Sequence, residues 1–250
     1  MKINQRLTLS FLGMLLFANT TYANWQGNWL VGVSSGYAER RGDLSIGLAY
    51  NLPNIFFPRM INDFEFSDKG LIWGGLVGYQ AFCGAWLLGT ELHVDWDNFD
   101  KRRDFVFPDL AGVLSWDVRG RYEREPLIAL SARVGYEMAP YFLAYMRLGV
   151  ETSKDKLDVR VAADTSMFPF GVIEMHDSRW LYRYLVGVGA ETPVFCTPLS
   201  LRLEYNYHSK SDALESAGAI SFPFFNPVLS SYMHPKENSI KVSVVWNFVA

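Results

Sequence analysis

Lys241-Val-Ser-Val-Val-Trp246-Asn-Phe248, near the end of the chain, alternates apolar residues with polar or small ones. Successive side chains of a β-strand point to opposite faces, so the apolar residues, ending in Trp246 and Phe248, share one face. A soluble sheet rarely ends on such a strand, because its aromatic face and unpaired edge invite aggregation. In a closed membrane barrel the last strand pairs with the first and lipid covers the apolar face. The stretch therefore predicts a transmembrane β-barrel.

The same stretch is similar to the carboxy-terminal assembly signal of bacterial outer-membrane barrels. Four residues carry this resemblance: the polar Lys241, the small Ser243 two positions later, and the outward aromatic residues Trp246 and Phe248. Ser243 stands where glycine is usual, and two further residues follow Phe248. The resemblance implies that the barrel-assembly machinery recognises the last strand.

The amino terminus has the composition of a secretory signal peptide. Lys2 and Arg6 precede an apolar run over residues 7–17, and Thr21 and Ala23 are small residues three and one before a possible cleavage site. A single membrane anchor is the alternative, but the run is shorter than the roughly 20 apolar residues that span a bilayer. We therefore expect a cleaved signal peptide over residues 1–23 and an outer-membrane barrel domain over residues 24–250.

Charge and aromatic content agree with an exported membrane protein. The chain has 23 Lys and Arg against 26 Asp and Glu, a net charge of −3. This balance argues against a nucleic-acid partner, which would need a basic face. Aromatic residues make up 16% of the chain, as expected if aromatic belts lie at two lipid–water boundaries.

Eight segments alternate apolar and polar residues with the period of a strand. Segments of about ten residues, tilted near 45°, are what the hydrocarbon core of a bilayer requires. Short connections alternate with four connections of about 30 residues, much longer than ordinary hairpin loops. The pattern predicts an all-β fold, an up-and-down antiparallel barrel of eight strands with short periplasmic turns and long extracellular loops. The predicted strands are 28–38, 71–80, 85–96, 127–136, 141–151, 181–191, 199–208 and 239–248, and the long loops are 39–70, 97–126, 152–180 and 209–238.

The strand count has one alternative. Residues 43–50 and 157–161, inside two of the predicted loops, also alternate weakly. They either extend hairpins above the membrane or add a pair of strands, giving ten.

Side-chain volume indicates which face is inside. In each strand one set of alternate positions is apolar and the other is not; we call each set a parity. The apolar parity contains about five side chains in each strand, including several tryptophans. The interior of an eight-stranded barrel is just wide enough for side chains to fill, and these would not fit there. The opposite parity, rich in glycine and single charged residues, would fit. The apolar face is therefore expected to point toward lipid.

The mature chain resembles the small eight-stranded outer-membrane barrels, the family of the opacity proteins and of the membrane domain of outer-membrane protein A. The resemblance is carried by residues 29–37 (WLVGVSSGY), 74–79 (GGLVGY), 133–136 (RVGY), 184–191 (YLVGVGAE) and 203–207 (LEYNY), together with the last strand. It implies a bacterial outer-membrane location. It implies little about activity, because adhesins, stabilisers, lipid enzymes and small pores share this fold.

Acidic and basic residues meet on the parity that faces the lumen. In a narrow lumen such groups are expected to pair, because an unpaired buried charge costs several kcal/mol. Two interpretations remain: a salt-bridged core that plugs the barrel, or the lining of a narrow, porin-like pore. The predicted interior set is Glu91, His93, Asp95, Arg133, Arg147, Glu151, Arg183, Glu191, Arg202, Glu204 and Lys241.

Catalytic and metal sites have little support in the sequence. His176, Asp177 and Ser178 are the residue types of a hydrolase triad, but adjacent residues cannot all point at one reacting centre. His93 and Asp95 resemble the imidazole and carboxylate residues of outer-membrane proteases. The simpler interpretation is that they are polar core residues. No pair of histidines has metal-ligand spacing. We therefore expect no enzyme activity, no cofactor and no metal, with a barrel hydrolase as a remote alternative.

The two cysteines raise the possibility of a disulfide. Cys83 and Cys196 both lie in predicted periplasmic turns, in a compartment that permits disulfides. These turns lie across the barrel mouth from each other, farther apart than a disulfide tolerates unless the longer turn folds inward. A bridge and two free thiols both remain open.

The long loops contain apolar clusters that suggest partner binding. These are residues 55–57, 105–107, 167–170 and 222–225. Exposed apolar patches often mark interaction sites, although such loops could also pack on each other. Basic residues at 101–103, with Arg119, Arg121 and Arg124, could contact lipopolysaccharide phosphates. Our leading hypothesis is a non-enzymatic surface protein whose loops bind a host or envelope partner or support envelope integrity.

Overall fold

The computed structural model describes residues 25–51, 60–99, 101–107, 114–165, 169–195, 197–219 and 226–249. All regular secondary structure in these residues is β-strand, and none of them forms a helix long and apolar enough to cross a membrane. The strands are β1 (Gln26–Asn51), β2 (Met60–Cys83), β3 (Trp86–Asp97), β4 (Lys101–Phe107), β5 (Leu114–Arg124), β6 (Leu127–Ala139), β7 (Phe142–Thr165), β8 (Pro169–Pro193), β9 (Leu199–His208), β10 (Leu214–Ala219) and β11 (Asn226–Val249).

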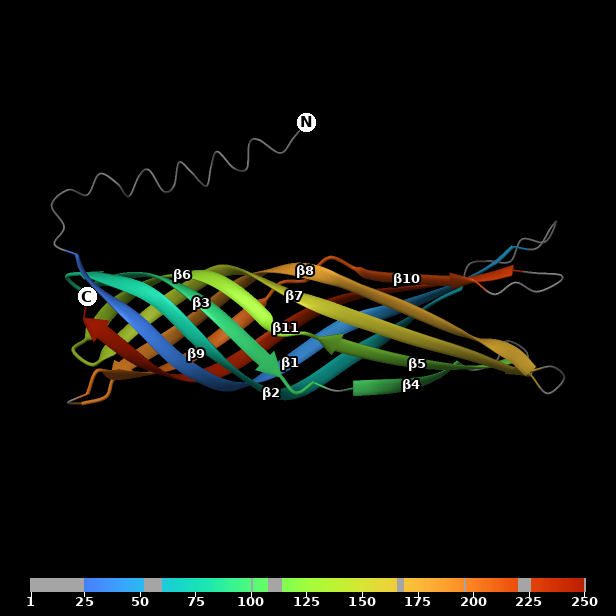
Figure 1. Ribbon diagram of the computed structural model, residues 1–250, viewed down its shortest axis with the longest axis horizontal. Helices are drawn as coiled ribbons and strands as arrows, with labels where there is room; N and C mark the ends of the chain where they lie inside the picture. Colours follow the sequence, from blue (N-terminus) through green and yellow to red (C-terminus); the bar gives the residue numbers. More distant parts are fainter. Residues whose placement is uncertain are drawn as a thin grey trace, which may run out of the picture.

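Eight of these strands close into a ring. In order around it they are β1, β2, β3, β6, β7, β8, β9 and β11, and each pairs antiparallel with its neighbours. The first and last strands close the ring, with Trp29 opposite Phe248 and Tyr37 opposite Ile240 (Figure 1). Closure gives every ring strand two neighbours, so no backbone edge is exposed to lipid. The predicted eight-stranded antiparallel barrel is confirmed.

Each predicted strand lies inside a ring strand except for one terminal residue in two of them. Only Ala85 and Tyr141, which lie in the turns before β3 and β7, fall outside them. The β2–β3 turn contains Gly84 at φ 57°, in the left-handed region that glycine adopts without strain. Short turns of this kind, the start of β1 and the end of β11 lie at one end of the barrel (Figure 1), which is the periplasmic end in outer-membrane barrels.

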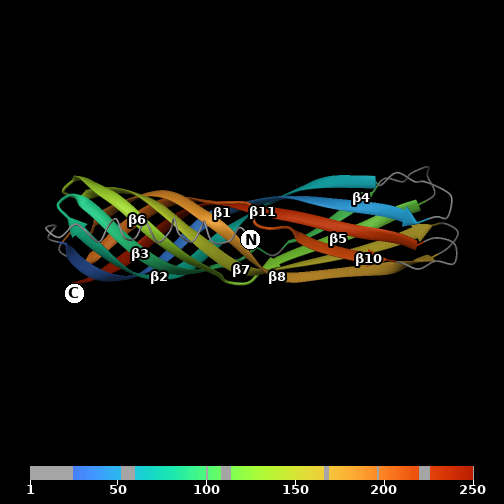
Figure 2. The same ribbon diagram turned by 90° about the horizontal axis from the view of Figure 1, so that it is seen from above.

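Most residues of the four predicted long loops are in strands. The strands β1, β2, β7, β8 and β11 each have 24 to 26 residues and run well past the ends of β3, β6 and β9. Beyond those ends, β5 pairs with β7, β4 pairs with β5, and β10 pairs with β11. The weak alternation at residues 43–50 and 157–161 therefore belongs to hairpins that continue above the ring, and it adds no ring strands (Figures 1 and 2).

An apolar belt surrounds the ring. Its outward side chains are large and exposed, for example Trp29 (56%), Val33 (66%) and Tyr184 (69%). Aromatic side chains pack edge to face at its periplasmic boundary, where the ring centroids of Trp86 and Tyr136 are 5.1 Å apart. Only lipid can accept such a surface without a large hydrophobic penalty. The belt therefore marks the membrane-spanning part of the barrel.

The side-chain pattern inverts beyond the belt. On β7 the inward residues Leu157, Val159 and Val161 are at most 1% exposed, whereas the outward side chains of Asp158 and Arg160 are 47% and 56% exposed. This is the pattern of a sheet that packs an apolar face inward in water. We call this part the extracellular extension: β4, β5 and β10 together with residues 41–51 of β1, 60–68 of β2, 156–165 of β7, 169–177 of β8 and 226–236 of β11.

Candidate functional site

The lumen of the barrel collects the charged residues that the sequence placed on the inward parity. All of them are 7% exposed or less. They come from six of the ring strands, β3, β6, β7, β8, β9 and β11. The ring closure brings together residues far apart in the sequence, such as Asp95 and Lys241, which are 146 positions apart. The residues of this predicted interior set are Glu91, His93, Asp95, Arg133, Arg147, Glu151, Arg183, Glu191, Arg202, Glu204 and Lys241.

Two arginines and two glutamates form a lower ionic layer across the lumen. Arg133 on β6 contacts Glu91 at 2.7 Å and Glu191 at 2.8 Å. Arg202 on β9 contacts the same two carboxylates, at 2.6 and 2.8 Å. Each guanidinium therefore joins β3 to β8. The Tyr145 ring lies 3.9 Å from the Arg133 guanidinium and supports it by a cation–π contact.

Further charge pairs fill the middle of the lumen. Arg147 contacts Glu204 at 3.3 Å, and the Tyr145 hydroxyl donates to Glu204 at 2.7 Å. Lys241 on β11 pairs with Asp95 on β3. The pair has room because Gly74, next to Asp95, has no side chain; a Cβ there would collide with the Asp95 carboxylate. Glycines on the inward parity thus let long charged side chains cross the lumen.

A second layer closes the lumen at the outer boundary of the belt. Arg40 contacts Asp97 at 2.8 Å and Glu237 at 3.1 Å, and Arg124 contacts them at 2.7 and 2.9 Å. All four side chains are 6% exposed or less. The ring of Phe99 lies 4.2 Å from the Arg40 guanidinium. We call Arg40, Asp97, Arg124 and Glu237 the upper ionic layer.

The sequence analysis missed this upper layer because its residues fell in segments predicted as loops. Arg124 was interpreted as a possible contact for lipopolysaccharide, and this was wrong: its side chain is 3% exposed and faces inward. The sequence of β7 contained a signal that the strand continues past residue 151. Ser153 and Asp155 occupy the same alternate, inward-facing positions as Glu151. Asp155 pairs with Arg183 and accepts a 2.5 Å hydrogen bond from Tyr122.

His208 also belongs to the lumen. It continues the inward parity of Arg202 and Glu204 on β9 and is 3% exposed. Its Nδ1 lies 2.6 Å from Glu151, and its Nε2 lies 3.3 Å from the Ser239 hydroxyl. The lumen thus contains paired or hydrogen-bonded charges along its length, from the lower layer to the upper one.

The outer surface of the extension carries charge pairs that are open to solvent. Arg41 donates to Glu39 at 2.9 Å, and Lys156 contacts Glu125 at 2.8 Å. The hydrogen bond from Lys156 holds the pKa of the Glu125 carboxyl below its ordinary range. Exposed pairs of this kind contribute little to stability and mainly keep the surface soluble.

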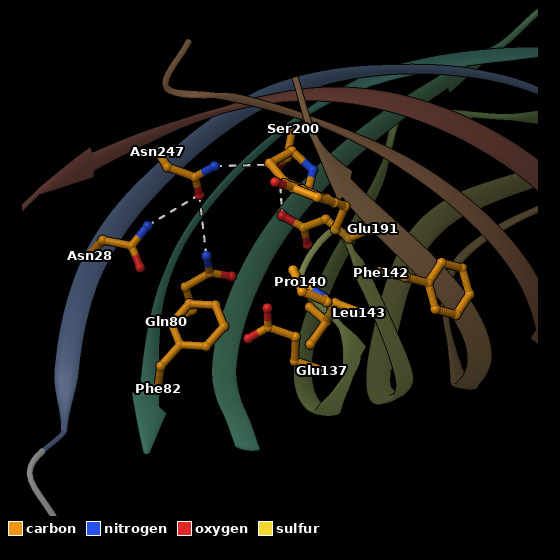
Figure 3. Close-up of a pocket in the computed structure, with 12 residues that line it drawn as sticks. Asn28, Gln80, Phe82, Glu137, Pro140, Phe142, Leu143, Glu191, Ser200 and Asn247 are labelled. Carbon is orange, nitrogen blue, oxygen red and sulfur yellow. Dashed lines mark hydrogen bonds between the residues drawn. The ribbon is translucent and has the colours of Figure 1, made fainter. Parts of the chain in front are cut away.

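A small cavity lies at the periplasmic mouth, below the lower ionic layer. Its volume is about 240 Å³. Its floor carries Glu191, Ser200 and an amide cluster (Figure 3). In this cluster Asn28 and Gln80 both donate to Asn247, each at 3.1 Å. Its remaining lining residues are Phe82, Glu137, Pro140, Tyr141, Phe142, Leu143 and Pro193.

The residues considered for catalysis have separate partners. His93 contacts Glu91 at 3.0 Å inside the lumen. His176 pairs with Asp158 on the exposed surface, whereas Asp177 contacts Arg179 at 2.8 Å, so His176, Asp177 and Ser178 do not converge on one point. In the part of the chain that the structure describes, no group of three or more His, Cys, Asp or Glu residues is arranged to hold a metal ion.

The remaining sequence predictions concern the two chain ends and the cysteines. Lys241 and Ser243 point into the lumen, and Trp246 and Phe248 point outward at 49% and 47% exposure. Their role as an assembly signal stays a prediction. Cys83 is half buried at the end of β2, but Cys196 and the signal peptide at residues 1–23 lie outside the described residues. The disulfide and the cleavage therefore also stay predictions.

The family of the chain follows from its sequence. The model of the outer membrane protein beta-barrel domain family matches residues 9–248, which is nearly the whole chain. The chain belongs to this family, and its location is the bacterial outer membrane. A search of curated proteins found no match.

Several solved outer-membrane proteins are similar to the chain at low identity. The attachment invasion locus protein Ail of Yersinia pestis is 13% identical, with 83% of this chain and 97% of that one covered and a TM-score of 0.32. OprG from Pseudomonas aeruginosa is 12% identical, with 88% and 97% covered and a TM-score of 0.44. Neisserial surface protein A is 14% identical, with 84% and 97% covered and a TM-score of 0.28. At these values the likenesses carry no argument about activity.

Proposed function

We propose that the protein is a non-enzymatic surface anchor: a barrel with a closed lumen that carries a rigid extracellular extension, which binds a host or envelope partner. One observation carries the proposal. The same strands that form the ring continue past the belt and exchange their polar interior for an apolar one. A strand extension with its own packed core keeps its shape outside the membrane, as a structure that displays binding residues requires.

The packing of the lumen supports anchoring over conduction. The lower and upper ionic layers each cross the barrel with all four charges paired. Removing one partner of a buried ion pair costs about 3–5 kcal/mol. An ion passing through the lumen would have to separate such pairs twice.

Apolar clusters in the sequence support partner binding. Residues 55–57, 167–170 and 222–225 are rich in phenylalanine, and most of them lie outside the described residues. Aromatic residues are enriched at protein interfaces. Lipopolysaccharide is a second proposed partner, through Arg119, Arg121 and the basic residues 101–103. The barrel-assembly machinery is a third, through the last strand.

Conductance and adhesion together test this function. The refolded mature chain, checked by its heat-shifted band on a gel, is placed in a planar bilayer. We expect no single-channel steps. Reproducible steps that change in Arg133→Ala would assign the competing function, a narrow channel lined by the interior arginines and glutamates.

The binding part of the proposal is tested in cells. Residues 222–225 are replaced by Gly-Ser-Gly-Ser, and the 55–57 and 167–170 clusters are replaced in separate variants. We expect lower adhesion of barrel-displaying cells to host cells, or greater sensitivity of the envelope to detergent, with the heat-shifted band retained. The proposal fails if all three variants behave as the unaltered chain in both assays.

A further inference from the structure

The cavity at the periplasmic mouth has a buried polar floor and an exposed aromatic rim. Gln80, Glu191 and Ser200 on the floor are 2%, 7% and 3% exposed. At the rim, Tyr141 and Phe142 are 56% and 45% exposed. A cavity with this arrangement offers a ligand specific polar contacts at its inner end and apolar contact along its sides.

Hydrogen bonds on the floor use up most of its donors. Asn28 Nδ2 and Gln80 Nε2 both donate to Asn247 Oδ1, and Asn247 Nδ2 donates to the Ser200 hydroxyl at 3.3 Å. That hydroxyl in turn donates to Glu191 at 2.6 Å (Figure 3). By contrast, neither Asn28 Oδ1 nor the Glu137 carboxylate accepts a hydrogen bond from any residue that the structure describes. The cavity therefore offers free acceptors and needs a ligand that brings donors.

The cavity also carries a net negative charge. The Glu191 carboxylate is balanced, because Arg133 and Arg202 together face Glu191 and Glu91. Glu137 has no such counter-charge among the described residues, and Figure 3 shows its carboxylate pointing toward the side of the cavity with Gln80 and Phe82. The mouth thus carries one unbalanced negative charge next to aromatic rings, and both attract cations.

We propose that this cavity binds a small organic cation, whose primary ammonium group donates to Glu137 and whose alkyl chain lies against Phe82 and Tyr141. A volume of about 240 Å³ corresponds to roughly eight water molecules at ~30 Å³ each, which suits a short alkyl amine and excludes a folded domain. Two sources share this chemistry: a free diamine in the periplasm, and the ammonium group of a lysine-like side chain. The site is independent of partner binding by the extension.

Calorimetric titration of the refolded mature barrel in detergent micelles tests the proposal. The probes are 1,5-diaminopentane, the amide of Nα-acetyl-lysine, and 1,5-pentanediol as a neutral analogue of equal length. We expect at least one of the two amines to bind about tenfold more tightly than the diol, because a charged hydrogen bond contributes more than a neutral one. Tighter binding of the diamine assigns the free amine as the ligand, and tighter binding of the lysine derivative assigns the side chain.

Variants of Glu137 separate the cavity from the rest of the barrel. Glu137→Gln keeps the size of the side chain and should weaken amine binding about tenfold, whereas Glu137→Asp keeps the charge and should retain most of it. Glu39→Gln, on the outer surface next to the start of the extension, is the matched control and should not change binding. The proposal is overturned if neither amine binds more tightly than the diol, or if Glu137→Gln binds as tightly as the unaltered barrel. The heat-shifted band verifies the fold of each variant.

Discussion

The membrane-spanning part and the extracellular extension are built from the same strands with opposite polarity. On β7 the inward side chains are charged at Arg147 and Glu151 and apolar at Leu157 and Val159. The outward side chains change in the reverse sense, from Leu148 and Val150 to Asp158 and Arg160. The alternation itself continues without a break along the strand.

This difference shows that the surrounding medium, and not the backbone, determines which face of a strand carries the apolar side chains. The hydrophobic effect buries apolar groups only where water is the alternative. In the belt the alternative is lipid, so apolar groups gain nothing by turning inward, and the lumen must satisfy its own polar groups. The upper ionic layer lies where the polarity inverts, and it forms the boundary between the two regions.

The strongest test of this comparison places a charge in the interior of the extension. Leu157→Asp should destabilise the extension by at least about 4 kcal/mol, because it removes a buried leucine and introduces an unpaired carboxylate. We expect rapid proteolysis of the extension while the heat-shifted band of the ring persists. Val172→Asp changes an exposed residue of the extension and is the control. Equal protease resistance of Leu157→Asp and the unaltered chain would contradict the apolar core.

Loss of a charge inside the ring should have the next largest effect. Glu91 accepts from both arginines of the lower ionic layer. Glu91→Gln leaves them with an uncompensated positive charge and should cost about 3–4 kcal/mol of unfolding free energy. Urea unfolding in phospholipid vesicles, followed by tryptophan fluorescence, measures this. Glu125→Gln, which removes an exposed carboxylate, is the comparison, and an equal change in both variants would refute a special role for the lower layer.

Exchanging outward residues on β7 tests the belt. Leu148→Arg exposes a charge to the hydrocarbon and should cost about 2–4 kcal/mol, the penalty for arginine near the bilayer midplane. Arg160→Leu, the reciprocal change in the extension, should alter the unfolding free energy by less than about 0.5 kcal/mol. The same urea titration compares the two. Similar costs would mean that the two positions face the same medium.

The smallest expected effect concerns an exposed ion pair of the extension. The pKa of Glu125 lies below its ordinary range because Lys156 donates to the carboxylate. The contribution of this pair is present above the unfolded pKa of the carboxyl and is lost as the pH falls through its folded pKa. Lys156→Met should raise the Glu125 pKa toward its ordinary value in a carbon-13 NMR titration. Lys210→Met, on another part of the surface, should leave that pKa unchanged, and a Glu125 pKa that does not respond to Lys156→Met would exclude the pair in solution.

Local alternation was enough to predict the ring. Each predicted segment lies in a ring strand to within one residue, and the last strand pairs with the first as expected. The reason is that membrane strands repeat one simple rule, apolar outward and small or polar inward, over about ten residues. The pattern also placed residues such as Glu91 and Arg133 on the lumen side, where they lie.

The extension and the upper ionic layer could not be predicted in the same way. Arg40, Asp97, Arg124 and Glu237 come from segments whose alternation inverts, and a pattern search for apolar-outward strands ends where the medium changes. Arg124 looked like a surface charge because its sequence neighbours are charged as well.

By itself, the sequence determined the class of fold, the strands of the ring and the parity of each side chain, because these depend on neighbours along one strand. Only the tertiary structure decided which charges meet across the lumen and where the strands leave the membrane. Partners such as Arg202 and Glu91 are 111 residues apart. Their contact depends on the register and closure of eight strands, which no local pattern specifies.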